Sequence, residues 1–228
     1  MLLKEEKSMK RKITVRGYGT ECIYPDQIEV RIGLESHKQS YEETIACAQE
    51  QVAQLSSELM RCGFTREDLK TEKLNVETAY ESRRGEDGSF RRYMDGYICS
   101  HFLLLQFSKD MELLGKVIEV IAQSPAEPDY SIRFTFKDRN AAAEMLLKEA
   151  ARDARERAEI LCKASGVKLG RLIRIDHNQG EPDVYSTTEY SNDAVLAPAV
   201  IKKSALTDMK PEEIRLTGTA TFIWEIID

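Results

Sequence analysis

The feature that most constrains the fold is an alternation of apolar and polar side chains with a period of two. Between Asp26 and Ser36 every second residue is aliphatic, in the order Ile28, Val30, Ile32 and Leu34. This period is typical of a β-strand with one buried face and one solvated face. Further strands are predicted over residues 69–80, 97–107, 131–137, 171–176 and 213–227. Strands that are mostly apolar on one face only indicate antiparallel or mixed sheets with helices on one side.

Three amphipathic helices are predicted between these strands. The first opens at Ser40, in a Ser-Tyr-Glu-Glu sequence that has the pattern of a capping box, and Gly63 ends it. The others cover residues 110–123 and 140–165, and the apolar stripe of the last one is expected to consist of Leu147, Ala150, Ala154, Ala158 and Leu161. The expected fold class is α+β, with a mixed, largely antiparallel sheet and amphipathic helices packed on one face.

The chain of 228 residues is long enough to bury a core without metal or disulfide staples. One domain is predicted over residues 12–228, after a polar tail of residues 1–11. A division into two lobes, residues 12–107 and 108–228, is the alternative. Residues 178–210 lack periodicity and are expected to form a long loop or an interaction arm.

Charge and composition restrict the partners and the compartment. The net charge is -6 with a pI near 5.4, so nucleic acid is not expected as a partner on overall charge. Five widely spaced cysteines indicate reduced thiols rather than a disulfide framework. The first residues, MLLKEEKSMKRK, have no apolar segment after the basic ones, and no apolar run approaches the ~18 residues of a membrane-spanning helix. A cytoplasmic location is therefore expected, with no membrane span.

A Gly-x-Gly sequence, Gly17-Tyr18-Gly19, follows the first apolar alternation. In a dinucleotide site these glycines would end a strand and open a helix, whose N-terminal amides bind phosphate. Here Thr20 to Pro25 leads into another strand, and the third glycine of the motif is missing. We therefore predict that the first strand stops at a turn or bulge formed by the glycines, and that the chain has no cofactor.

Several motifs taken in order resemble the SIMPL family, also called domain of unknown function 541. They are the I-x-V-x-G-x-G start at Ile13, Pro25-Asp26 before a strand, TREDLKTEKLNVETAYE after Gly63, Gly96-Tyr97, DARERAEILCKASGVKLGRLIRI and KPEEIRLTGTATFIWEI. The resemblance covers residues 12–228 and implies an α+β fold without established catalytic residues. Many relatives resemble bacterial envelope or periplasmic proteins, some associated with stress responses, and the chain departs from them in lacking an export signal.

Catalytic and metal-binding groups are sparse. Cys99 and His101 lie two residues apart on one strand face, which is compatible with a nucleophile and its base. That face continues into leucines and a phenylalanine, so two packed core residues are the preferred interpretation. The three histidines lie on different elements and the cysteines form no Cys-x-x-Cys pair, so no metal site is predicted. We expect a protein without catalytic residues, and a thiol-dependent enzyme is the third alternative.

The most basic segment lies within residues 81–96, which are predicted to be a turn-rich connection between antiparallel strands. Its candidate partner surface consists of Arg83, Arg84, Phe90, Arg91, Arg92 and Tyr93. Arginines interleaved with aromatic rings could hold a nucleic-acid backbone and stack on bases. Acidic residues in the same segment dilute this charge, so a solvated loop is the preferred interpretation and nucleic-acid binding is the alternative function.

The strand over residues 98–107 is unusual because both of its faces are apolar. Opposite the Cys99 face lie the candidate oligomer contacts Ile98, Phe102 and Leu104. Either a second layer of the same chain covers them or another copy does, because contiguous exposed apolar side chains mark interfaces. The function expected from the sequence is that of a non-enzymatic, self-associating bacterial protein of the SIMPL type, with a scaffold role related to stress or to the envelope.

Overall fold

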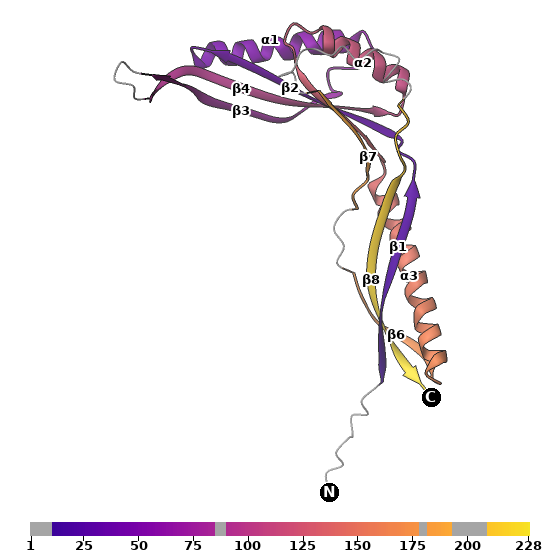
Figure 1. Ribbon diagram of the computed structural model, residues 1–228. Helices are drawn as coiled ribbons and strands as arrows, with labels where there is room; N and C mark the ends of the chain where they lie inside the picture. The colour runs from indigo at the N-terminus through magenta and orange to yellow at the C-terminus, as the bar shows by residue number, and fades with distance from the viewer. Residues whose placement is uncertain (1–10, 85–89, 178–181, 193–208) are drawn as a thin grey trace. The chain divides into compact units, whose positions relative to one another are not determined.

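The computed structural model describes residues 11–84, 90–177, 182–192 and 209–228 (Figure 1). The elements follow in the order β1 (Lys12–Ile23), β2 (Gln27–Lys38), α1 (Tyr41–Met60), β3 (Leu69–Arg84), β4 (Phe90–Ser108), α2 (Met111–Gln123), β5 (Asp129–Thr135), α3 (Arg139–Ala164), β6 (Lys168–Asp176), β7 (Tyr185–Asn192) and β8 (Ile214–Ile227). The strands form two sheets, ordered β1-β8-β6 and β3-β4-β2-β5-β7. The predicted α+β class is confirmed.

The chain divides into two compact units that are each assembled from separate segments. The three-stranded unit contains residues 1–24, 136–186 and 213–228, and the five-stranded unit contains residues 25–135 and 187–212. This division differs from the two consecutive lobes predicted, because the chain leaves the first unit after β1 and returns to it for α3. Part of the predicted loop 178–210 forms the strand β7, while the predicted tail 1–11 lies outside the described residues except for Arg11.

In the five-stranded unit, α1 and α2 cover one face of the sheet (Figure 1). The apolar alternation of β2 points to these helices, and Ile28, Val30 and Ile32 are buried there. The capping prediction is confirmed, because the side chain of Ser40 accepts a hydrogen bond of 3.2 Å from the amide of Glu43 at the start of α1. The opposite face of this sheet carries no helix among the described residues of the unit.

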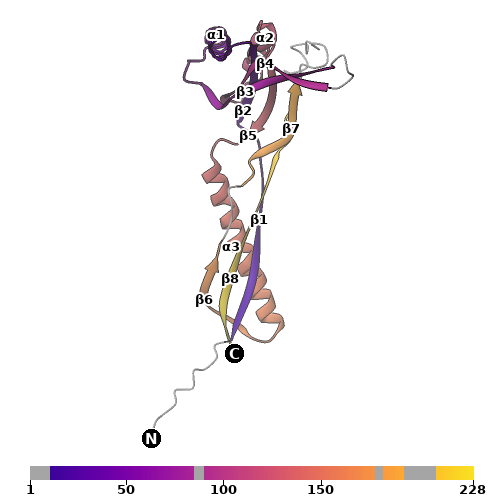
Figure 2. The ribbon, with the colours of Figure 1, turned by 90° about the vertical axis from the view of Figure 1, so that its left-hand side faces the viewer.

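In the three-stranded unit, α3 lies along one face of the sheet (Figure 2). Strand β1 does not stop at the glycines as predicted. It pairs with β8 in an unbroken antiparallel register, with Gly17 opposite Ala220 and Gly19 opposite Gly218. A Cβ on Gly17 would overlap the carbonyl oxygen of Ala150, and one on Gly19 would overlap that of Leu146. The glycines therefore allow the helix backbone to touch the strand backbone, which is the correction to the predicted turn or bulge.

The buried stripe of α3 also differs from the prediction. It contains Ala150, Ala154 and Ala158 as expected, but Leu146 and Cys162 complete it in place of Leu147 and Leu161. Every residue of this stripe follows the previous one by four positions. Such a row is inclined to the helix axis, so it lies along a strand that crosses beneath the helix at an angle.

The hairpin formed by β3 and β4 is longer than the sequence predicts. Both strands continue through most of residues 81–96, and only residues 85–89 between them lie outside the described residues. A register shift between Thr78 and Tyr80 coincides with Gly96 in β4, which has a φ of 100°. A glycine in this conformation is typical of a bulge that bends and twists a ribbon. Figure 1 shows the hairpin extending beyond α1.

Candidate partner-binding surfaces

All six predicted partner-surface residues lie in the strands of this hairpin, and each is exposed. The structure does not place them on one surface. Residues directly opposite one another in an antiparallel pair point to the same face, and successive residues alternate. The register pairs Tyr80 with Met94, Ser82 with Arg92, and Arg84 with Phe90. These side chains form one face of the hairpin, which we call the cationic strip.

The other face of the hairpin carries Glu81, Arg83, Arg91 and Tyr93. Its charges are neutralised locally: the Arg83 Nε donates a hydrogen bond of 2.8 Å to Glu81, and this contact raises the pKa of Arg83. Of the acidic residues that dilute the arginines in the sequence, Glu81 therefore lies on this face, whereas Glu86 and Asp87 lie outside the described residues. Among the described hairpin residues, the cationic strip contains no carboxylate.

The cationic strip holds rings and unneutralised guanidinium groups side by side. Phe90 is 74% exposed, Tyr80 54% and Met94 53%. The guanidinium carbon of Arg92 lies 4.5 Å from the centre of the Tyr80 ring, within the range of a cation–π contact. Within the described residues, neither Arg84 nor Arg92 forms an ion pair. Sequence reasoning missed Tyr80 and Met94, which a strict count of alternation through both strands would have added.

The predicted oligomer contacts lie on the uncovered face of the five-stranded sheet. Ile98, Phe102 and Leu104 lie on one face of β4, with Ser100 between Ile98 and Phe102, and we call the three apolar residues the outer row. Phe102 is 44% exposed, while Ile98 and Leu104 are half-buried. A Cβ on Gly33, the neighbour of Phe102 in β2, would lie 3.5 Å from the Phe102 ring. The Phe102 ring therefore lies at ordinary contact distance over Gly33 of β2.

Charged side chains beside the outer row are arranged with opposite signs at its two ends. Lys70 lies opposite Leu104 and Lys73 opposite Phe102 on β3, whereas Glu77 lies opposite Ile98. On β2, Glu35 lies at the acidic end of the row. At the basic end, Arg31 forms an ion pair of 3.3 Å with Glu72. The two lysines thus leave a positive end and the two glutamates a negative end.

Cys99 and His101 share the helix-facing side of β4, as predicted. Burial raises the pKa of the Cys99 thiol and lowers the pKa of the His101 imidazole. The Nε2 of His101 lies 2.9 Å from the hydroxyl oxygen of Thr71. A catalytic pair needs the opposite shifts, a thiolate stabilised beside a cationic imidazole. The surroundings of both groups therefore favour their neutral forms.

A polar cluster joins β1 to α3 in the three-stranded unit. The amide of Tyr18 donates a hydrogen bond of 2.9 Å to Asp153 Oδ2, and Arg157 Nε donates one of 2.8 Å to Asp153 Oδ1. The Arg157 contact is the main cause of the lowered pKa of Asp153. The guanidinium carbon of Arg157 also lies 5.2 Å from the centre of the Tyr18 ring. This cluster occupies an outward-pointing amide of an edge strand, which protects that edge from other strands.

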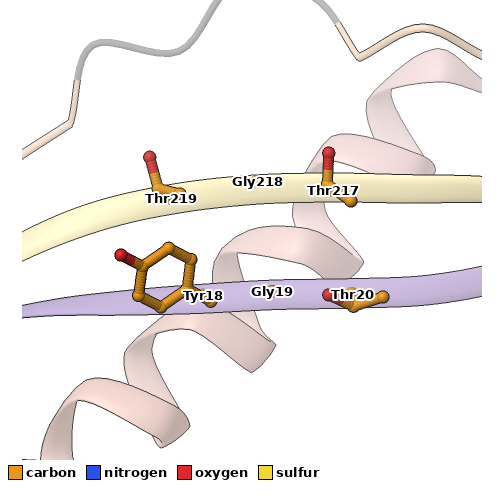
Figure 3. A pocket seen from close by; sticks show the side chains of 6 residues that line it. All are labelled: Tyr18, Gly19, Thr20, Thr217, Gly218 and Thr219. Carbon is orange, nitrogen blue, oxygen red and sulfur yellow. The ribbon is translucent and has the colours of Figure 1, made fainter.

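Behind this cluster, on the sheet face away from α3, lies a shallow hollow of about 310 Å³ (Figure 3). It is lined by Tyr18, Gly19, Thr20, Thr217, Gly218 and Thr219. The figure shows the Tyr18 ring beside Thr219, with the Thr217 and Thr219 hydroxyls pointing to the same side. The lining offers hydroxyl groups and one aromatic ring, and it contains no carboxylate, imidazole or thiol.

Metal-ligating clusters and membrane-spanning helices are both absent from the described residues. No group of three or more His, Cys, Asp or Glu side chains in them is arranged to hold a metal ion. None of the described helices is both long enough and apolar enough to cross a membrane.

The comparison with protein families gives a match over nearly the whole chain. The model of the SIMPL family, described as "Protein of unknown function (DUF541)", matches residues 13–224. The chain therefore belongs to the SIMPL family, and the resemblance stated from the sequence is confirmed.

One curated protein is similar to the chain at a greater distance. It is the 26 kDa periplasmic immunogenic protein of Brucella melitensis, which is 20% identical over 171 residues. The aligned region covers 75% of this chain and 68% of the Brucella protein. Since that relative is described as periplasmic, the comparison does not support the cytoplasmic location expected from the first residues.

Proposed function

We propose that this SIMPL-family chain is a non-enzymatic protein that self-associates through the outer row and serves as a scaffold. The observation that carries this proposal is the exposed ring of Phe102 in the middle of a sheet face that no described helix covers. Apolar side chains in contiguous exposed positions mark protein interfaces. The envelope-related role implied by the family is supported by the periplasmic description of the Brucella protein, and the stress role stays a prediction.

A second copy is the occupant that the charges favour. A two-fold axis that crosses β4 at Ser100 would place Lys73 of one copy opposite Glu77 of the other, and Glu77 of the first copy opposite Lys73 of the second. An interface around a two-fold axis has to be self-complementary in this way, because each surface meets its own image. Pairing of opposite charges would fix how the outer rows of the two copies align, because apolar contacts alone have little directional preference.

The test is the molecular mass in solution of the wild type and of Phe102→Asp, measured by light scattering over a wide range of protein concentration. We expect the wild type to exceed the monomer mass and Phe102→Asp to be a monomer, since burying an unpaired carboxylate opposes association. The control is Phe90→Asp, an exposed aromatic of the same unit outside the outer row, which should associate as the wild type does. A wild type that is monomeric at every concentration contradicts the proposal.

A further inference from the structure

The cationic strip has no role in the core of the five-stranded unit. Its side chains lie on a two-stranded ribbon whose residues are exposed on both faces, and such ribbons are marginally stable on their own in water. Three large apolar side chains, Tyr80, Phe90 and Met94, nevertheless remain exposed on one face. Isolated exposed apolar residues are ordinary, but here they share a face with Arg84 and Arg92, which form no ion pair with any described residue.

The different charges on the two faces of the hairpin indicate which kind of partner the cationic strip could bind. Glu81 neutralises Arg83 on the other face of the ribbon, whereas within the described residues Arg84 and Arg92 have no carboxylate partner. The cationic strip is therefore complementary to an anion.

The aromatic rings of the cationic strip indicate that the bound anion also carries planar groups, on which the rings can stack. Tyr80 and Phe90 lie at opposite ends of the cationic strip, because Phe90 is paired with Arg84, four residues beyond Tyr80. At ~3.3 Å per residue the two rings are separated by about 13 Å along the ribbon. A single-stranded nucleic acid presents phosphates and unpaired bases in succession, and proteins bind it by combining cationic groups with aromatic side chains on which bases stack.

We propose that the cationic strip binds single-stranded nucleic acid without sequence preference, with Arg84 and Arg92 on phosphates and Phe90 stacking on a base. An anionic lipid surface is the competing partner for arginines beside apolar groups. The spacing of the rings along the ribbon favours a strand whose phosphates and bases alternate over the same distance. Such a strand, running along the ribbon, needs only the face that carries the cationic strip.

The test uses the full chain and a fluorescein-labelled oligothymidylate, with binding measured by fluorescence anisotropy across a salt series. Two phosphate contacts predict a slope of about -1.4 in a plot of log affinity against log salt concentration, or roughly a sevenfold loss between 50 and 200 mM salt. We expect Arg84→Gln with Arg92→Gln to remove most of this salt dependence. Phe90→Ala should weaken binding about tenfold, the typical effect of losing one stacked base.

Arg83→Gln is the matched control, because Arg83 lies on the same ribbon but faces away and is already paired with Glu81. It should bind the oligonucleotide as the wild type does. All variants should keep the thermal unfolding midpoint of the wild type, since the substituted side chains are exposed. Equal binding by the wild type and the double variant, or no binding by the wild type, overturns the proposal. Flotation with vesicles containing phosphatidylglycerol, without oligonucleotide binding, overturns it in favour of a lipid surface.

Discussion

At the scale of single residues, the glycines of β1 set the distance between a helix and a sheet. Gly17 and Gly19 face α3, and a side chain at either position would overlap a carbonyl oxygen of the helix backbone. Alanines at positions 150 and 154 complete this close approach from the helix side. Small residues on both elements thus replace the interlocking of large side chains that usually separates a helix from a sheet.

Gly17→Ala is therefore expected to destabilise the three-stranded unit by about 3 kcal/mol, the upper end of ordinary overpacking costs. The measurement is denaturant unfolding followed by tryptophan fluorescence. Trp224 is the single tryptophan of the sequence, and its ring stacks on Phe222 at 5.4 Å within this unit. The control, Thr20→Ala, lies on the solvent side of β1 and should cost less than about 1 kcal/mol. Equal costs for the two variants would contradict close packing as the role of Gly17.

At the scale of elements, one carboxylate connects α3 to the edge of the sheet. Asp153 accepts a hydrogen bond from the backbone of β1 and another from Arg157 one turn further along the helix. A carboxylate stabilised in this way has a lowered pKa in the folded chain. Its contribution to the free energy of unfolding is complete above the ordinary pKa of aspartate and is lost as the pH falls towards the lowered value.

Asp153→Asn should reduce the free energy of unfolding by about 1 kcal/mol at neutral pH, as expected for one hydrogen bond weakened at the edge of a sheet. The difference from the wild type should narrow as the pH is lowered below about 4. Tryptophan fluorescence in urea at several pH values measures both effects. The control is Glu149→Gln, which removes a 2.7 Å ion pair with Arg152 on the same helix. A pH-independent difference between Asp153→Asn and the wild type would refute this role.

At the scale of the whole molecule, the chain builds two units from interleaved segments and leaves strand surfaces uncovered. In the three-stranded unit β1 pairs with β8, which lies near the other end of the sequence. In the five-stranded unit one sheet face is packed by helices and the other carries the outer row. Both proposed binding surfaces, the outer row and the cationic strip, are formed by strands of the five-stranded unit.

Self-association would couple stability to concentration. If two copies meet at the outer row, the thermal unfolding midpoint of the wild type should rise with protein concentration, because association stabilises only the folded state. Phe102→Asp should show a midpoint that is independent of concentration. Calorimetry at several concentrations of both proteins makes this measurement, and a concentration-independent midpoint for the wild type would contradict the proposed interface.

Local sequence patterns predicted most of the helices and strands, and they predicted which face of β2 is buried. The period-two alternation of β2 and the capping serine of α1 are both confirmed, because each depends on residues within one turn or strand. The segregation of the hairpin charges was missed, since residues 81–96 were interpreted as a turn and no alternation was followed through them. The α3 stripe was misplaced by one residue at each end, because the inclination of the helix on its strand is not written in the helix sequence.

The amino-acid sequence by itself determined most of the secondary structure, the α+β class, the family and the side chains that form the outer row, since these follow from periodicity, caps and motif order. Only the tertiary structure decided that Gly17 and Gly19 receive a helix rather than form a turn, that the units interleave, and that Arg84 and Arg92 share a face on which the described hairpin residues include no carboxylate. These features depend on contacts between segments far apart in the chain. Such contacts are selected by the complementarity of whole surfaces, which no local pattern encodes.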